Sequence, residues 1–207
     1  MRKSIHICIS DSRVSKNPVI EHKFKDNNLS KSVEYFITDN KGRWSQSSFV
    51  IHDNKRHHHS AKTSNRTKTF LPDTIVDYKK LKPKAWGLLS VEKAIFELYG
   101  VVKNPIKNKI NLSSIEHHYC EQRIPVHIKS DIDLESFAIF SDQIEKPTIA
   151  VFSISKDSLI DIKIRVKIYK VCQNHTIIVV AKDRNGNFYK TSSKGQIACG
   201  DNCGGGG

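Results

Sequence analysis

Short segments of strand character, separated by turn signals at regular intervals, dominate the chain after residue 100. The clearest is residues 161–168, where isoleucine and valine alternate with aspartate, lysine and arginine. Alternation at period two is typical of a β-strand with one buried and one solvated face. An apolar run at 176–181 predicts a central strand, and Arg-Asn-Gly-Asn at 184–187 predicts a hairpin turn into a strand starting at Phe188.

Four further strands are predicted in the same part of the chain, at residues 109–112, 123–128, 136–140 and 147–154. Strands with turn signals every ~8–12 residues favour an antiparallel β-sandwich. A regular succession of strands and helices, which would indicate a parallel sheet, is missing from this pattern. The sequence therefore predicts an all-β fold.

One short helix is predicted ahead of these strands, at residues 90–100. Ser90 can cap its start and Gly100 can end it. Its apolar residues recur at the i, i+3, i+4 and i+7 spacing of a single helix face. These residues are Val91, Ala94, Ile95 and Leu98.

The first part of the chain also carries strand signals, at residues 4–9, 19–24 and 33–37. Asp-Asn-Lys-Gly at 39–42 predicts a hairpin turn into a return strand at 44–51. Residues 52–70 show no apolar periodicity, which indicates a solvated linker. We divide the chain into a β segment (1–51), a polar basic linker (52–70), a sandwich domain (71–197) and a Cys/Gly tail (198–207).

Composition narrows the classes of function. The chain has 207 residues and a formal net charge of +13, but the charge is dispersed and accompanies no nucleic-acid-binding motif. We expect neither nucleic-acid nor membrane binding, since no window holds the ~18 consecutive apolar residues of a membrane span. The first eight residues show no secretory or twin-arginine signal. Paired catalytic carboxylates, a Ser/His/Asp signature and a phosphate-binding glycine loop are missing too, so we predict neither an enzyme nor a cofactor.

The five cysteines form an odd set, so at least one thiol stays outside any intramolecular disulfides. They are Cys8, Cys120, Cys172, Cys199 and Cys203. Nothing apolar follows Ile197, so we expect a mobile tail with an accessible thiol. There are two alternatives to an accessible, reactive thiol. The tail could be a disordered glycine-rich end with two incidental cysteines, or Cys199 and Cys203 could form a local disulfide. A diglycine tail is also found in ubiquitin-like modifiers, but the strand-rich pattern argues against that fold.

Two histidine clusters could bind a metal ion, because neutral imidazole is a good ligand. The first is the run of three histidines at residues 57–59, which we interpret as part of the polar linker. The second is His-His-Tyr-Cys at 117–120, which has no paired second motif. We therefore predict no metal site.

Several segments of the second unit follow one another in a recognisable order. A short helix around residues 94–96 ends at Gly100, and strands follow at 124–126, 138–140 and 151–152. After these come the alternating strand 162–166, the apolar run 177–181, Gly-Asn-Phe-Tyr at 186–189, and a cysteine among glycines. In this succession, residues 88–205 resemble SoxY, the carrier subunit of the Sox thiosulfate-oxidising system. That family's tail typically reads Gly-Gly-Cys-Gly-Gly, where this chain has Asp-Asn-Cys-Gly-Gly at 201–205.

The first unit resembles the C-terminal half of SoxZ, the partner subunit. The resemblance rests on Val-Ser-Lys-Asn-Pro at 14–18, His-Lys-Phe-Lys at 22–25 and Thr-Asp-Asn-Lys-Gly at 38–42. Both sets of motifs in one chain imply a fused carrier with a truncated SoxZ-like segment. Half a sandwich leaves strand edges unpaired. We therefore expect this segment to pack on the SoxY-like domain, to pair with another chain, or to fold poorly.

The resemblance implies an immunoglobulin-like antiparallel sandwich, a periplasmic location and a carrier role. Cys203 would hold sulfur intermediates covalently, and Gly204 and Gly205 would give freedom to the carrier arm. The implied partners are a haem-containing coupling enzyme, a sulfate-releasing hydrolase and, in some organisms, a molybdenum–haem sulfane dehydrogenase. Self-association or pairing with a Z-like chain is also implied. The alternatives are a non-carrier β-sandwich scaffold that recruits Sox-like enzymes, or a degraded fusion product.

Overall fold

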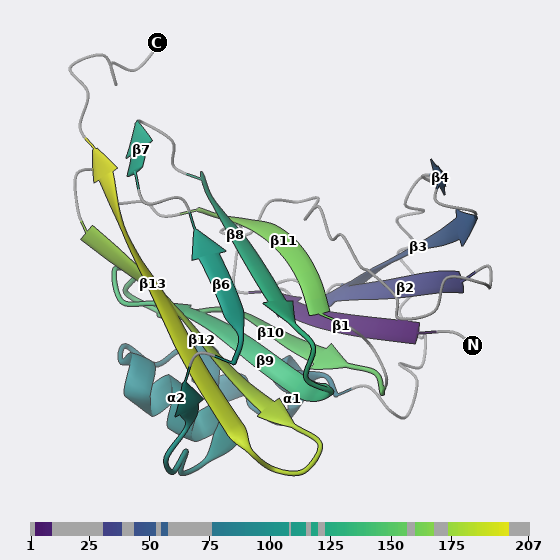
Figure 1. Ribbon diagram of the computed structural model, residues 1–207. Helices are drawn as coiled ribbons and strands as arrows, with labels where there is room; N and C mark the ends of the chain where they lie inside the picture. Colours follow the sequence, from purple (N-terminus) through teal and green to yellow (C-terminus); the bar gives the residue numbers. More distant parts are fainter. Residues whose placement is uncertain are drawn as a thin grey trace.

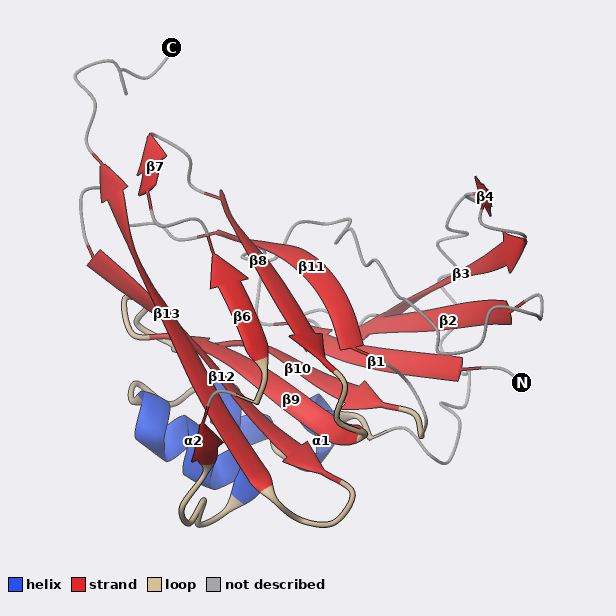
Figure 2. Ribbon diagram, in the orientation of Figure 1, coloured by secondary structure: helices blue, strands red, loops and turns tan. Residues whose placement is uncertain are grey.

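Two β-sheets and a thin layer of helices make up the computed structural model of the chain, shown in Figures 1 and 2. The structure describes ten ranges of the chain: 3–9, 31–38, 44–52, 55–57, 76–107, 109–114, 117–119, 123–156, 160–167 and 174–198. Within these ranges, strands far outnumber helices. The prediction of an all-β sandwich is confirmed.

The larger sheet, sheet A, contains ten strands in the described part of the chain. Their order is β4-β3-β2-β1-β10-β9-β12-β13-β5, and β7 also pairs with β13. The strands are β1 (Lys3–Ile9), β2 (Lys31–Thr38), β3 (Trp44–His52), β4 (Lys55–His57), β5 (Ile106–Lys107), β7 (His117–Tyr119), β9 (Leu134–Ser141), β10 (Thr148–Ile154), β12 (Asn174–Asp183) and β13 (Phe188–Ala198).

The smaller sheet, sheet B, has the strand order β11-β8-β6. It consists of β6 (Asn111–Ser114), β8 (Arg123–Ser130) and β11 (Ile160–Lys167), with both neighbouring pairs antiparallel. All seven strands predicted in the second unit exist, and they begin close to the predicted positions. Three pairs in sheet A depart from the antiparallel prediction, because β1–β2, β13–β5 and β13–β7 run parallel.

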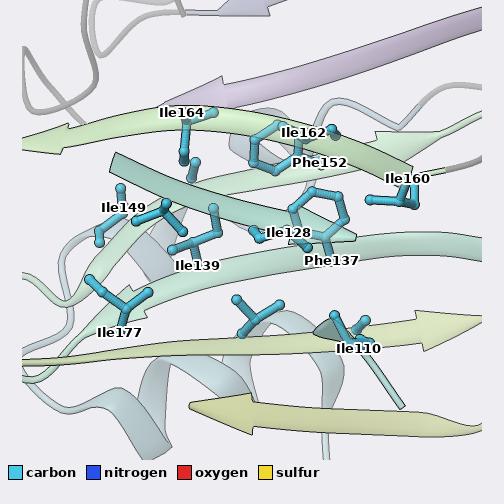
Figure 3. Packing of buried hydrophobic residues seen from close by; sticks show 14 of the residues in the cluster. Ile110, Ile128, Phe137, Ile139, Ile149, Phe152, Ile160, Ile162, Ile164 and Ile177 are labelled. Atoms are coloured by element: carbon cyan, nitrogen blue, oxygen red, sulfur yellow. The ribbon is translucent and has the colours of Figure 1, made fainter. Parts of the chain in front are cut away.

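The main core lies between the two sheets. Isoleucines and valines from β8 and β11 pack there against the inward-facing residues of β9, β10 and β12. Figure 3 shows Phe137 and Phe152 among these isoleucines, and their rings stack with centroids 4.2 Å apart. The predicted alternation of β11 is confirmed from Ile162 to Val166, where isoleucine and valine are buried and Lys163 and Arg165 are exposed, but Asp161 is buried despite its polar position.

A second core lies on the other face of sheet A, under the helices. The helical layer consists of α1 (Tyr78–Leu81), the 3₁₀-helix η2 (Pro83–Trp86) and α2 (Val91–Tyr99). All four apolar residues of the predicted helix face are buried against alternate residues of β9, β10 and β12, such as Phe140 and Val180. These central strands are therefore covered on both faces, which explains their near-continuous apolar runs.

The start and end of α2 agree with the prediction. The hydroxyl of Ser90 accepts a hydrogen bond from the Lys93 N–H, and Gly100 ends the helix with φ of 71°. Hydrogen bonds from the backbone N–H of Glu92, and then from the Ser90 hydroxyl, lower the pKa of the Glu92 carboxyl. Both effects fit a carboxylate in the first turn of a helix.

The sequence prediction of a single helix was incomplete, because it missed α1 and η2. The side chain of Asp77 caps α1 by accepting from the Lys79 and Lys80 N–H groups, and η2 begins at Pro83. Each spans only four residues, too short to show helical periodicity in the sequence. Long-range contacts fix this segment, including a 2.8 Å hydrogen bond from the Thr148 hydroxyl to the Ala85 carbonyl.

The N-terminal strands extend sheet A beyond β10, as Figure 1 shows. Strand β1 pairs antiparallel with β10 over Ile5↔Ile154 to Ile9↔Ala150. Of the three outcomes expected for this segment, the structure shows packing on the second unit. The predicted hairpin is present as the antiparallel β2–β3 pair.

Strand β4, which lies within the stretch predicted to be a linker, pairs with β3. Residues 58–70 of that stretch lie outside the described residues, and so does the predicted strand at 19–24.

Candidate functional site

The sequence-predicted site residues Cys203, Gly204 and Gly205 lie outside the described residues. So do three of the other cysteines, Cys120, Cys172 and Cys199, whereas Cys8 belongs to β1. The structure does describe the strand that leads to the tail. Strand β13 ends at Ala198, five residues before Cys203 (198 to 203). Fully extended, five residues span at most about 17 Å, which bounds the distance between the Cα atoms of Ala198 and Cys203.

Two strands pair with the end of β13, and their pairing overlaps at Gln196. Strand β12 pairs antiparallel with β13 from Lys182↔Phe188 to Asn174↔Gln196. On the other side, β7 pairs in parallel with the end of β13, from Gln196↔His117 to Ala198↔Tyr119. Figure 1 shows β7 beside the tip of β13. The backbone from which the tail departs is therefore held by sheet hydrogen bonds as far as Ala198.

The opposite end of β13 is fixed by a buried carboxylate. Asp183, the last residue of β12, accepts hydrogen bonds from the N–H groups of Asn185 and Asn187 at 2.9 and 2.8 Å. It also accepts from the Asn187 side-chain amide and the Tyr189 hydroxyl, both at 2.9 Å. Gly186 completes the turn with φ of 87°, a conformation that favours glycine. The predicted hairpin at residues 184–187 is confirmed.

Burial and hydrogen bonding oppose each other at Asp183. Burial alone raises the pKa of its carboxyl, but the hydrogen bonds from Asn187 and Tyr189, and then from the turn backbone, outweigh burial and lower it. Burial, then the hydrogen bond to Asp183 and its negative charge, raise the pKa of the Tyr189 phenol. Both shifts keep Asp183 ionised and Tyr189 protonated, which are the states that the hydrogen bond between them needs.

Arg184 ties the hairpin tip to the neighbouring strands. Its guanidinium donates a 2.6 Å hydrogen bond to the carbonyl of Ile154 at the end of β10, and a longer one to the carbonyl of Leu134 in β9. It also forms an ion pair with Asp133 at 3.3 Å. The hairpin that carries the tail is thereby joined to the centre of sheet A.

Sequence reasoning missed a histidine–aspartate pair on the outer face of sheet B. His127 Nε2 lies 2.7 Å from Asp161 Oδ1. Asp161 is buried at 5% exposure although it occupies a polar position in the alternation of β11. The two side chains meet because β8 and β11 are adjacent, with Lys163 opposite His127 and Asp161 opposite Lys129. Only the strand register reveals this contact, so the sequence held no signal for it.

The comparisons with known proteins include a distant structural similarity. No family model and no curated protein matches the chain. Among solved structures, the chain is similar to the sulfur carrier protein SoxY from Chlorobium limicola f thiosulfatophilum. The identity is 19%, the TM-score is 0.45, and the match covers 52% of this chain and 96% of that one. A similarity this distant assigns the chain to no family and gives it no function.

The described residues also bear on metal and membrane binding. Within the ranges that the structure describes, no three His, Cys, Asp or Glu side chains gather to hold a metal ion. Of the histidine clusters considered from the sequence, His117–Tyr119 forms β7, while Cys120 and the histidines at 58 and 59 lie outside those ranges. No described helix is both long and apolar enough to cross a membrane.

Tyr99, which is partly buried with its hydroxyl enclosed, belongs to the fold rather than to a site. Burial raises the pKa of its phenol well above the ordinary value. Its ring meets that of Phe188 edge-on, with centroids 5.9 Å apart, which joins α2 to the start of β13. Through this aromatic contact, the helical layer packs directly against the hairpin that leads to the tail.

Proposed function

We propose that the chain is a sulfur carrier of a Sox-type thiosulfate oxidation pathway, with sulfur intermediates bound covalently to Cys203. The proposal rests on the order of SoxY-like segments along residues 88–205 and on the cysteine among glycines that follows them. The observation that carries it is the pairing of β13 with β12 as far as Gln196 and with β7 as far as Ala198, close ahead of Cys203. A fixed strand followed by a short glycine-rich segment suits a swinging arm, since glycine allows a wide range of backbone conformations.

The chemistry needs a thiolate and little else from this chain. An unperturbed cysteine has a pKa near ~8.5, so a minor fraction is ionised at neutral pH. In the coupling step, the thiol sulfur bonds to the outer sulfur of thiosulfate, a proton is released, and two electrons pass to a haem-containing enzyme. The product is Cys–S–S–SO₃⁻. The disulfide bond in this adduct stays exchangeable, so the carrier can be unloaded.

A hydrolase would then add water to the terminal sulfone and release sulfate with two protons, which leaves Cys–S–S⁻ on the arm. A molybdenum–haem sulfane dehydrogenase is the proposed next partner, where the organism has one. These enzymes would act in the periplasm on a carrier that is not itself a catalyst. The partner pockets would have to reach Cys203, which lies at most about 17 Å from the end of β13.

Peptide mass spectrometry of the full chain, isolated from thiosulfate-exposed cells, tests the proposal. The fragment that contains Cys199 and Cys203 should carry a thiosulfonate, sulfane or sulfonate adduct that a thiol reductant removes. The matched variants are Cys203→Ser, which should lose the adduct, and Cys199→Ser, which should keep it. An unmodified Cys203 thiol in such cells, or a permanent disulfide between Cys199 and Cys203, would refute the carrier function and favour a scaffold that only recruits enzymes.

A further inference from the structure

A polar recess opens beside β6, at the edge of sheet B that lies next to β13. Its volume is about 290 Å³. Figure 1 shows β6 between β8 of its own sheet and β13 of sheet A. Seven residues line the recess: Ile110, Asn111, Leu112, Ser113, His127, Lys129 and Thr191.

Two cross-strand pairs arrange the polar side chains of this recess. Asn111 lies opposite Lys129, and Ser113 lies opposite His127, in the antiparallel register of β6 and β8. Since Ile128 of β8 is buried in the core between the sheets, its neighbours His127 and Lys129 face outward. Opposed side chains stand about 5 Å apart and successive pairs about 7 Å apart. Four polar side chains therefore border an area the size of a small tetrahedral ion.

The charge of this area is positive. Lys129 is exposed, and among the described residues it forms no ion pair. The recess lining contains no carboxylate. Asp161, which lies opposite Lys129 in the β8–β11 register, is buried and bonded to His127 at 2.7 Å. Lys163, opposite His127, adds a second exposed cation to the same face of sheet B.

The donors fit an oxyanion. The Lys129 ammonium, the Asn111 amide and the hydroxyls of Ser113 and Thr191 can all donate hydrogen bonds. A charge-assisted bond from an ammonium to an oxyanion is roughly twice as strong as a neutral one. His127 is held in place by Asp161 and forms one wall of the recess.

We propose that this recess binds a free tetrahedral sulfur oxyanion, of the size and charge of sulfate or thiosulfate, with Lys129 as its charge partner. The choice of sulfur rests on the proposed function, whereas binding of a tetrahedral dianion does not. Thr191 lies seven residues before Ala198 (191 to 198), about 23 Å along an extended strand. The tail spans at most about 17 Å to Cys203, so a free anion reaches the recess more readily than an adduct on the same chain.

Titration of the full chain with sulfate or thiosulfate, at constant ionic strength and followed by NMR amide shifts, tests the site. Saturable shifts are expected at Asn111, Ser113 and Lys129. Lys129→Gln should weaken binding about 10- to 100-fold, the value of one charge-assisted hydrogen bond. Lys163→Gln is the matched control on the same face but outside the recess, and it should stay within about twofold.

Shifts that never saturate, or equal losses in the two lysine variants, would overturn the site in favour of general attraction to a basic surface. Asn111→Leu provides a second variant that keeps the charge and should also weaken binding. Weaker sulfate binding by protein loaded with an adduct on Cys203 would overturn the assignment to a free anion. The titration uses protein with an unmodified Cys203 thiol. If no binding is found, the recess proposal is refuted, whereas the carrier function is tested separately by mass spectrometry.

Discussion

Replacing Asp183 with alanine should destabilise the protein by about 3 kcal/mol. The carboxylate accepts four hydrogen bonds in the turn, each between 2.8 and 2.9 Å. Three come from the exposed residues Asn185 and Asn187, whose donors can turn to water in the variant. The fourth comes from the Tyr189 hydroxyl, which belongs to a residue only 7% exposed. An unpaired buried donor costs about 1–3 kcal/mol, and hydrogen bonds to a charged group contribute about 1.5–3 kcal/mol.

Urea unfolding followed by circular dichroism would measure this loss, which corresponds to a fall in Tm of about 6–12 °C for a chain of this size. Tyr189→Phe and the double variant complete a double-mutant cycle. The double variant should be destabilised by clearly less than the sum of the single variants, because removing the hydroxyl removes the unpaired donor. A loss below about 0.5 kcal/mol for Asp183→Ala, or strict additivity in the cycle, would refute this account of the hairpin.

The same carboxylate predicts a loss of stability in acid. The pKa of Asp183 is lowered in the folded protein, so the unfolded chain binds its proton more readily. Its contribution is fully present above the unfolded pKa of about 3.9 and is lost as the pH falls through the lower folded value. The free energy of unfolding of the wild type should therefore fall more steeply below about pH 4 than that of Asp183→Asn. Parallel pH profiles of the two proteins would contradict the assignment.

Two further substitutions test the core and the turn. Phe137→Ala should lower the free energy of unfolding by about 3–5 kcal/mol, because the ring is fully buried and stacked on Phe152. Urea unfolding measures this loss. A loss below about 1 kcal/mol would mean that this core is loosely packed. Gly186→Ala should cost about 1–2 kcal/mol from its φ of 87° alone, since nothing lies within 4 Å of an added Cβ. Gly87→Ala is the matched control, with a negative φ and only an ordinary contact at 3.7 Å, and equal costs at the two glycines would contradict the backbone explanation.

Much of the second unit could be predicted from its sequence, because its local patterns agree with its tertiary environment. The alternation of β11 follows its half-buried position in sheet B, and the Asn-Gly turn matches the β12–β13 hairpin. The face of α2 was predicted residue by residue, since one helix on one sheet buries a single stripe. The candidate cysteine and its glycines were also chosen from sequence, and they remain a prediction because they lie outside the described residues.

Other features could not be found in this way. Strand pairing between distant segments, such as β1 on β10 or β7 on β13, depends on backbone hydrogen bonds that are alike for every residue type. The parallel β1–β2 pair and the short helices α1 and η2 leave no periodic signal. The recess beside β6 requires the register of two sheets at once.

The sequence by itself determined the longer strands of the second unit and the face that α2 buries, because the period of apolar residues follows the local backbone geometry. It also supplied the tail cysteine and the order of segments on which the carrier proposal depends. Only the tertiary structure decided which strands are neighbours. That choice brings His127 to Asp161, closes the Asp183 network around Tyr189, and places Lys129 opposite Asn111. The physical reason is that these contacts join residues far apart in the chain. Such residues come together only when whole sheets pack.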